Sequence, residues 1–108
     1  MKHIRKKIKK APSRKGDLAE YYAVTWLWDK GYEVFKNCGC TGLVDLIARD
    51  TKGNTILIDV KTFNKDTRWK GTWTNVPHSR SKKQVEMGVR ILGFNPETRK
   101  LRFIEHRT

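Results

Sequence analysis

The chain has 108 residues, of which 24 are Lys or Arg and 11 are Asp or Glu, so its formal net charge is +13. This length allows one domain at most, and no apolar run is long enough to cross a bilayer. The basic N-terminus lacks the apolar stretch of a secretory signal, so we expect a cytoplasmic protein, in a host cell if a phage encodes it. The charge predicts a polyanionic partner, and the sequence favours nucleic acid over a membrane because the first helix carries almost no basic residues.

Residues 1–15 carry many basic side chains and no acidic one. Repulsion between like charges predicts a disordered basic arm, which either lies along DNA phosphates or only keeps the protein in solution. We expect residues 16–108 to form the single folded domain. The candidate phosphate contacts before that domain are Lys6, Lys7, Lys9, Lys10, Arg14 and Lys15.

The first predicted element is a helix from Asp17 to Lys30, with Asp17 as its cap and Gly31 at its end. Glu20 lies at the head of a stripe of apolar residues spaced as on one helix face. Two interpretations of Glu20 are open: it is a catalytic carboxylate, or it forms a capping box with Asp17.

Three short strands follow, at Tyr32–Lys36, Leu43–Arg49 and Thr55–Thr62. The second and third are joined by a short turn, which predicts that they pair antiparallel. Both are strongly apolar, so we expect them to be central in the sheet and covered on both faces.

These two apolar strands also contain ionisable residues: Asp45 in one, and Asp59 with Lys61 in the other. Residues two apart on a strand share a face, so Asp59 and Lys61 project side by side. Buried charges need a partner or a metal ion. A buried salt bridge explains one acid, whereas a divalent cation held by carboxylates explains all of them together with Glu20.

We therefore predict a site with Mg²⁺, or Mn²⁺ as a substitute, whose catalytic residues are Glu20, Asp45, Asp59 and Lys61. Beside a DNA phosphate, such a metal activates water and stabilises developing charge, and a lysine orients the attacking water. Together with the basic charge, this pattern indicates hydrolysis of DNA phosphodiester bonds.

No periodicity is visible from Asn64 to Ser81, which predicts a long functional loop. Its Trp69 and Trp73 could stack on unpaired bases or pack in a dimer interface, and the sequence does not separate these alternatives. The candidate DNA contacts in and after this loop are Lys65, Arg68, Trp69, Lys70, Arg80, Lys82 and Lys83.

A short helix is predicted to begin after Ser81 and to run to about Met87, with Gln84 in a capping box. A hairpin of Val89–Phe94 and Leu101–His106 completes the chain. The resulting order, α-β-β-β-α-β-β, predicts an α/β fold with a central mixed β-sheet flanked by helices.

Three segments together resemble the PD-(D/E)XK nuclease superfamily, and within it most closely the archaeal-type Holliday junction resolvases. They are KGDLAE at 15–20, GLVDLIA at 42–48 and IDVKT at 58–62. Two positions depart from the family pattern: Val44 replaces a proline, and Asp59 stands where these resolvases usually have Glu.

The resemblance implies a restriction-endonuclease-like core and a homodimer that resolves four-way DNA junctions in recombination and repair. It also implies that Asp45, Asp59 and the Val60 carbonyl bind the metal and that Lys61 serves the attacking water. Glu20 would complete the site directly or through water. Gln84, in a segment like the start of the family's second core helix, is a weaker site candidate.

Two other functions remain open. The same site could belong to a repair, nicking or restriction-type nuclease that acts on other DNA. The chain could also be a non-catalytic basic DNA-binding module that keeps a nuclease fold.

Overall fold

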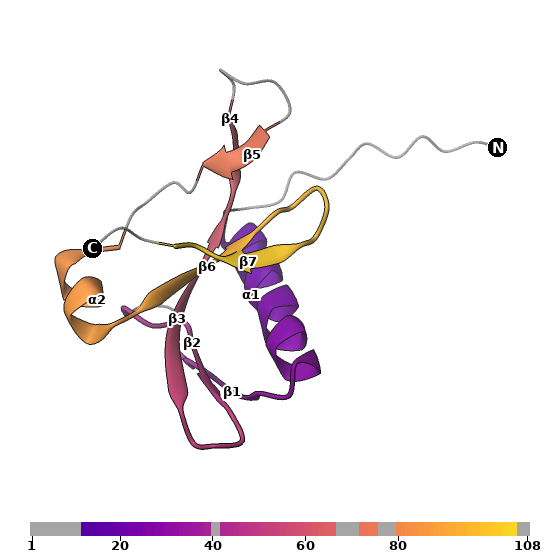
Figure 1. Ribbon diagram of the computed structural model, residues 1–108. Coiled ribbons are helices and arrows are strands. Elements are labelled where there is room, and N and C mark those ends of the chain that lie inside the picture. The colour runs from indigo at the N-terminus through magenta and orange to yellow at the C-terminus, as the bar shows by residue number, and fades with distance from the viewer. Residues whose placement is uncertain (1–11, 40–41, 67–71, 76–79, 106–108) are drawn as a thin grey trace.

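The computed structural model describes residues 12–39, 42–66, 72–75 and 80–105 (Figure 1). The predicted arm at residues 1–11 therefore lies outside the described residues. The elements in chain order are α1 (Pro12–Asp29), β1 (Glu33–Lys36), β2 (Leu46–Arg49), β3 (Thr55–Thr62), β4 (Asn64–Asp66), β5 (Thr72–Asn75), α2 (Lys82–Met87), β6 (Arg90–Phe94) and β7 (Leu101–Phe103).

Five strands form one mixed sheet in the order β1-β2-β3-β6-β7. Strand β3 is central and pairs antiparallel with β2 and parallel with β6. The predicted mixed sheet, the antiparallel pairing of β2 with β3 and the β6–β7 hairpin are all confirmed. The protein is an α/β domain built on this sheet.

Helix α1 covers one face of the sheet and forms the core with it (Figure 1). Ala23 and Leu27 are fully buried against residues of β2, β3 and β6. Their spacing of four residues places them on the same side of the helix. The predicted apolar stripe is thus the core-facing side of α1. No helix in the described part of the chain is long and apolar enough to cross a membrane.

The predicted start of the first helix is wrong, because α1 begins at Pro12 rather than after Asp17. Proline is favoured in the first turn of a helix, where its missing N–H costs nothing. Residues 12–15 are accordingly helical rather than part of a disordered arm. Asp17 lies inside the helix, so the capping-box interpretation of Glu20 is also wrong.

Strand β2 begins at Leu46 instead of Leu43, but Asp45 continues its hydrogen-bond pattern. The Asp45 N–H donates to the Ile58 carbonyl at 2.8 Å, and the Asn37 N–H donates to the Asp45 carbonyl at 2.9 Å. Asp45 therefore lies directly before β2 and is hydrogen-bonded on one side to β3 and on the other to the residue that follows β1.

The prediction that the central strands are covered on both faces is wrong for the face opposite α1. On that face Phe35 pairs with Ile47, and Ile47 pairs with Leu57, across three strands. Phe35 is 50% exposed, and the other two are half-buried. Helix α2, which lies beyond β3 from α1 in Figure 1, has only 6 residues and is too short to cover this row.

The predicted loop from Asn64 to Ser81 is wrong in part, since β4 and β5 form a separate two-stranded antiparallel ribbon. Strand β4 follows β3 after a single residue, so the ribbon extends from one end of the sheet (Figure 1). Its polar sequence lacks the alternation that marks a strand with a buried face. Trp73 lies in this ribbon, whereas Trp69 lies outside the described residues.

Candidate active site

The centre of the candidate site is the pair of carboxyl groups of Asp45 and Asp59. Asp45 ends the loop that enters β2, and Asp59 lies in β3, only 8% exposed. The two side chains share a hydrogen bond, and Asp45 Oδ2 also accepts the Val60 N–H at 2.7 Å. The predicted convergence of these two acids from neighbouring strands is therefore present in the structure.

This arrangement is electrostatically unfavourable for ionised Asp45. Burial, opposed by the hydrogen bond from Val60 and reinforced by Asp59 and Glu20, raises the pKa of Asp45 from 3.8 to about 7. Two carboxylates that share a site cannot both ionise easily. With a pKa of about 7, Asp45 is protonated in about half of the molecules at neutral pH, and added positive charge at the pair would displace that proton.

Lys61 supplies one positive charge, since its Nζ lies 3.5 Å from Asp59 Oδ2. Both side chains come from the same face of β3, as the spacing of two residues predicts. The salt-bridge alternative is thus realised for Asp59, but it does not restore an ordinary pKa to Asp45. A single lysine is insufficient to neutralise the pair.

Glu20 reaches the edge of this site from α1. Its Oε1 lies 4.0 Å from the Lys36 Nζ, and burial raises its pKa, partly opposed by Lys36. In the part of the chain that the structure describes, no three His, Cys, Asp or Glu side chains lie close enough together to hold a metal. The structure therefore gives no support to Glu20 as a direct metal ligand. That Glu20 contacts the metal through a water molecule stays a prediction.

Gln84 connects α2 to the acid pair. Its Nε2 donates to Asp59 Oδ2 and to the Leu43 carbonyl, both at 2.9 Å. Its Oε1 accepts the Ser81 N–H at 2.9 Å, and the Ser81 hydroxyl accepts the Gln84 N–H at 3.1 Å. The predicted capping box is confirmed, and the same carboxamide also fixes Asp59 and the segment before Asp45.

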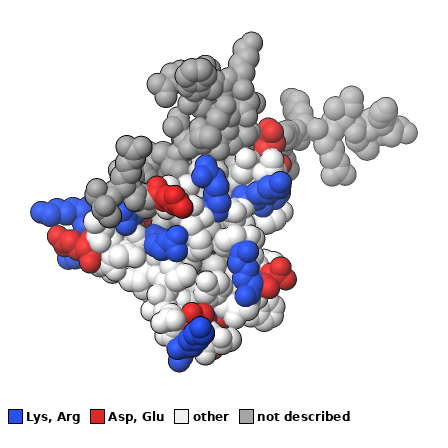
Figure 2. Space-filling model, viewed as in Figure 1, with Lys and Arg blue, Asp and Glu red and all other residues white. Residues whose placement is uncertain are grey.

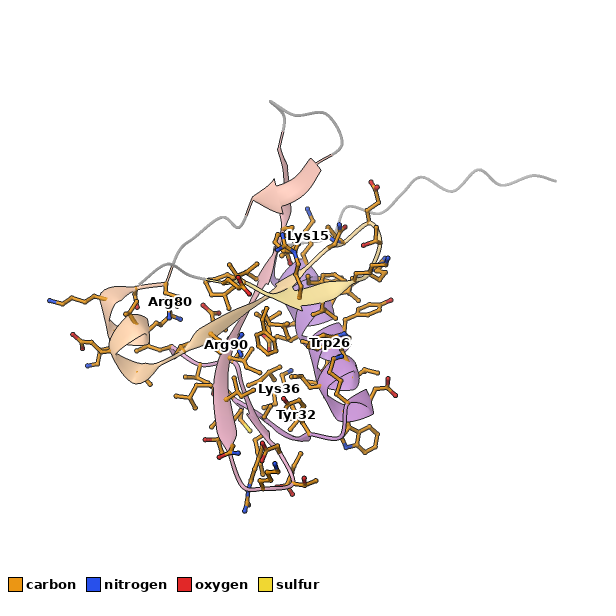
Figure 3. All side chains as sticks on the ribbon, viewed as in Figure 1. Lys15, Trp26, Tyr32, Lys36, Arg80 and Arg90 are labelled. Atoms are coloured by element: carbon orange, nitrogen blue, oxygen red, sulfur yellow. The ribbon has the colours of Figure 1, made fainter. Side chains whose placement is uncertain are left out.

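Some of the predicted DNA contacts lie among the described residues. Arg14 and Lys15 are exposed at the start of α1, and Lys82 and Lys83 are exposed on α2. Arg80 is half-buried just before α2, and its Nη1 donates to the Val89 carbonyl at 3.2 Å (Figure 3). Others lie outside the described residues: Lys6, Lys7, Lys9, Lys10, Arg68, Trp69 and Lys70. The side chain of Lys65, in β4, is not described.

On the face shown in Figure 2, Lys and Arg side chains are scattered among acidic ones and do not merge into one patch. The charge that predicts DNA binding is therefore spread over the described surface on this side of the molecule. Binding energy from counterion release depends on the number of phosphates contacted and does not require a single patch.

Two residues of the site were missed in the sequence. Lys36 lies between the sheet and α1, beside Glu20 (Figure 3). Alternation along β1 puts Lys36 on the same face as Val34, which is the signal that could have found it. Asn37 holds the loop before β2, because its Nδ2 donates to the Val44 carbonyl at 2.9 Å; nothing in the sequence indicates that contact.

The donor set fits a hard divalent cation. Mg²⁺ prefers oxygen ligands, keeps several waters and commonly uses only one or two carboxylates together with substrate phosphates. Asp45 and Asp59 supply such a pair, and the raised pKa of Asp45 shows that added positive charge there would be favourable. The Val60 carbonyl as a further ligand stays a prediction.

The fold is similar to that of a solved bacterial homing endonuclease, I-Ssp6803I. The TM-score is 0.68 at 18% sequence identity, and the match covers 88% of this chain and 69% of that chain. Comparison with protein-family models and with curated proteins finds no match. The likeness supports the α/β fold, and membership of the PD-(D/E)XK superfamily stays a prediction.

The first test concerns the charge state of Asp45 without metal. Its pKa is raised on folding, so its contribution to the free energy of unfolding is full below pH 3.8 and is lost as the pH rises to about 7. Urea denaturation of the wild type and of Asp45→Asn in EDTA, at a series of pH values, measures this. We expect the unfolding free energy of Asp45→Asn, relative to that of the wild type, to rise between pH 3.8 and about 7 and to stay constant above that pH. A difference that stays constant from pH 4 to pH 8 would contradict the account.

The second test separates the two roles of Gln84. Ser81→Ala removes only the cap and should cost about 1 kcal/mol of unfolding free energy. Gln84→Ala keeps that cap bond, which the backbone N–H of residue 84 donates, but it removes the side-chain bonds to the Ser81 N–H, Asp59 and the Leu43 carbonyl, and should cost about 1 kcal/mol for each lost bond. Only Gln84→Ala should weaken Mn²⁺ binding, by about 10–100-fold as for other residues that orient metal ligands. Calorimetric titration measures the binding, and equal Mn²⁺ affinities in the two variants would refute the second role.

Proposed function

We propose that this protein is a metal-dependent endodeoxyribonuclease. The observation that carries the proposal is the pair of half-buried Asp45 and buried Asp59 beside the Lys61 ammonium group, on a fold similar to that of an endonuclease. The net charge of +13 provides attraction for DNA. A purely structural ion pair would use Lys61 and Asp59 alone, and it would leave Asp45 beside them without a positively charged partner.

In this proposal Asp45 and Asp59 would hold Mg²⁺ or Mn²⁺, with Val60 offering its carbonyl. When bound, the metal would supply Lewis acidity and a water of lowered pKa at the scissile phosphate. The Val60 N–H and the Gln84 carboxamide fix the two carboxylates, so the ligands are held in place before DNA arrives. Fixed donors of this kind avoid reorganisation during the reaction.

Lys61 acts on the substrate side of the pair. Its side chain is 26% exposed, so its ammonium group can reach solvent while it stays near Asp59. There it orients the water whose oxygen attacks phosphorus, and it stabilises the negative charge that develops as the bond to the leaving oxygen breaks. Lys36, beside Glu20, adds a second positive charge on the α1 side of the site.

The substrate that we propose first is a four-way DNA junction, because the segments around Glu20, Asp45 and Asp59 resemble those of Holliday junction resolvases. A homodimer would then place one site on each of two opposed strands. The second candidate is an endonuclease that acts on ordinary duplex DNA, in repair, nicking or restriction. The fold likeness to a homing endonuclease favours this second candidate.

A synthetic four-way junction and a linear duplex of the same sequence, each incubated with Mg²⁺ or Mn²⁺, test the proposal. We expect paired symmetric nicks on the junction and a loss of about 10²–10³-fold in single-turnover rate for Lys61→Ala, as for other lost charge-stabilising donors. Lys100→Ala, which changes an exposed lysine in the β6–β7 turn, is the matched control and should cut normally.

Each other outcome has a distinct meaning. Equal cutting of the duplex would replace the junction with the second substrate class. An absence of cleavage by the wild type with every divalent metal tried would leave a non-catalytic DNA-binding module and would end the proposal.

A further inference from the structure

A pocket of about 220 Å³ opens beside Asp45 and has no part in the chemistry described above. It is formed by β1, the start of β2 and the residues just before β2. Its walls include the side of Asp45 and the apolar residues Phe35, Val44 and Ile47. A group that fills this pocket lies in contact with a residue of the acid pair.

Phe35 is the unusual element of this pocket. Its ring is 50% exposed, although it lies within a strand and has Ile47 as its cross-strand partner. Contiguous exposed apolar surface marks a contact site, and Phe35 continues the row of half-buried Ile47 and Leu57 on this face. No residue of α1 covers this ring, because α1 packs on the opposite face of the sheet.

We infer that the pocket binds an unpaired nucleobase of the DNA, next to the phosphate that is cut, with the base stacked on the Phe35 ring. The inference rests on the proposed function, which puts a phosphate at Asp45 and Asp59. Nucleotides carry a planar apolar group and an anionic phosphate close together. That combination matches an aromatic wall and an adjoining cation site in a protein of charge +13.

The size of the pocket supports one base rather than a larger ligand. Sites for drug-sized molecules have volumes of roughly 300–1,000 Å³, whereas this pocket has about 220 Å³. A base can enter only after it leaves its stack, which is easiest where pairing is already interrupted. The pocket would therefore favour branched, nicked or mismatched DNA over uninterrupted duplex.

A second copy of this chain is the main rival occupant for the exposed row around Phe35. The pocket is a small concavity of about 220 Å³, which fits one planar base better than the matching face of a second copy. DNA is negatively charged and is therefore attracted to this positively charged protein.

The experiment is a coupling test between Phe35 and the base. Single abasic sites are placed at each nucleotide around the branch point of a synthetic junction. Affinity is measured in EDTA, and single-turnover cleavage is measured in Mg²⁺. At one position the abasic site should weaken wild-type binding about 5–150-fold, the equivalent of a stacking energy of about 1–3 kcal/mol. The same abasic site should not weaken DNA binding by Phe35→Ala, and it should weaken binding by Phe35→Trp as much as binding by the wild type.

Trp28→Ala is the control variant, because Trp28 is 73% exposed on α1 and does not line the pocket. It should keep the wild-type response to the abasic site. Thermal unfolding of each variant shows whether it is folded, and Phe35→Trp keeps the test valid if Phe35→Ala is not.

Equal abasic effects in the wild type and Phe35→Ala would overturn the inference and leave the proposed nuclease intact. So would loss of a dimer in sedimentation experiments on Phe35→Ala with an unchanged abasic effect, since the occupant would then be a second copy. If the wild type does not cleave DNA, the proposed function fails, whereas the binding measurements in EDTA still decide whether the pocket holds a base.

Discussion

The repulsion between two carboxyl groups, Asp45 and Asp59, is the constraint around which the rest of this molecule is arranged. Backbone pairing of the β2 entrance with β3 brings them together, and the backbones of the two residues cannot separate without breaking the central sheet. Val60 donates to one group, and Gln84 and Lys61 contact the other. These contacts orient the pair, yet the pKa of Asp45 stays raised, so an additional cation would relieve an unfavourable charge.

The two faces of the sheet have different roles. The face toward α1 is closed and apolar, and it provides the core that holds the strands in register. The other face is partly open and places Phe35 and Ile47 beside Asp45. A small domain has little buried surface to spare, so leaving this face open lowers stability. Contact with DNA would offset that cost.

Much of this arrangement could be predicted from local patterns in the sequence. The bounds of β3 agree with the prediction, because its apolar residues are bracketed by a polar turn and by the end of the alternation. The pairing of Asp45 with Asp59 also follows from the short β2–β3 turn, which leaves few possible registers. The cap of α2 is local as well, because Ser81 and Gln84 lie within one helical turn.

The remainder depends on contacts between distant parts of the chain. Gln84 and Asp59 are 25 residues apart, and no periodicity indicates that they meet. The helical face that carries Glu20 is visible in the sequence, but its partner on the sheet, Lys36, is not. The β4–β5 ribbon was missed because it lies outside the main sheet and its polar sequence does not alternate.

The most direct test of the central claim is the position of a bound divalent cation. Crystals grown with Mn²⁺ give an anomalous signal that locates the ion without reference to activity. We predict one strong peak at about 2.0–2.2 Å from oxygens of both Asp45 and Asp59, the spacing typical of a small hard cation, and no such peak in Asp45→Asn. Mn²⁺ bound elsewhere on the protein, or an acid pair that stays hydrogen-bonded and metal-free at saturating Mn²⁺ above pH 8, would contradict the account.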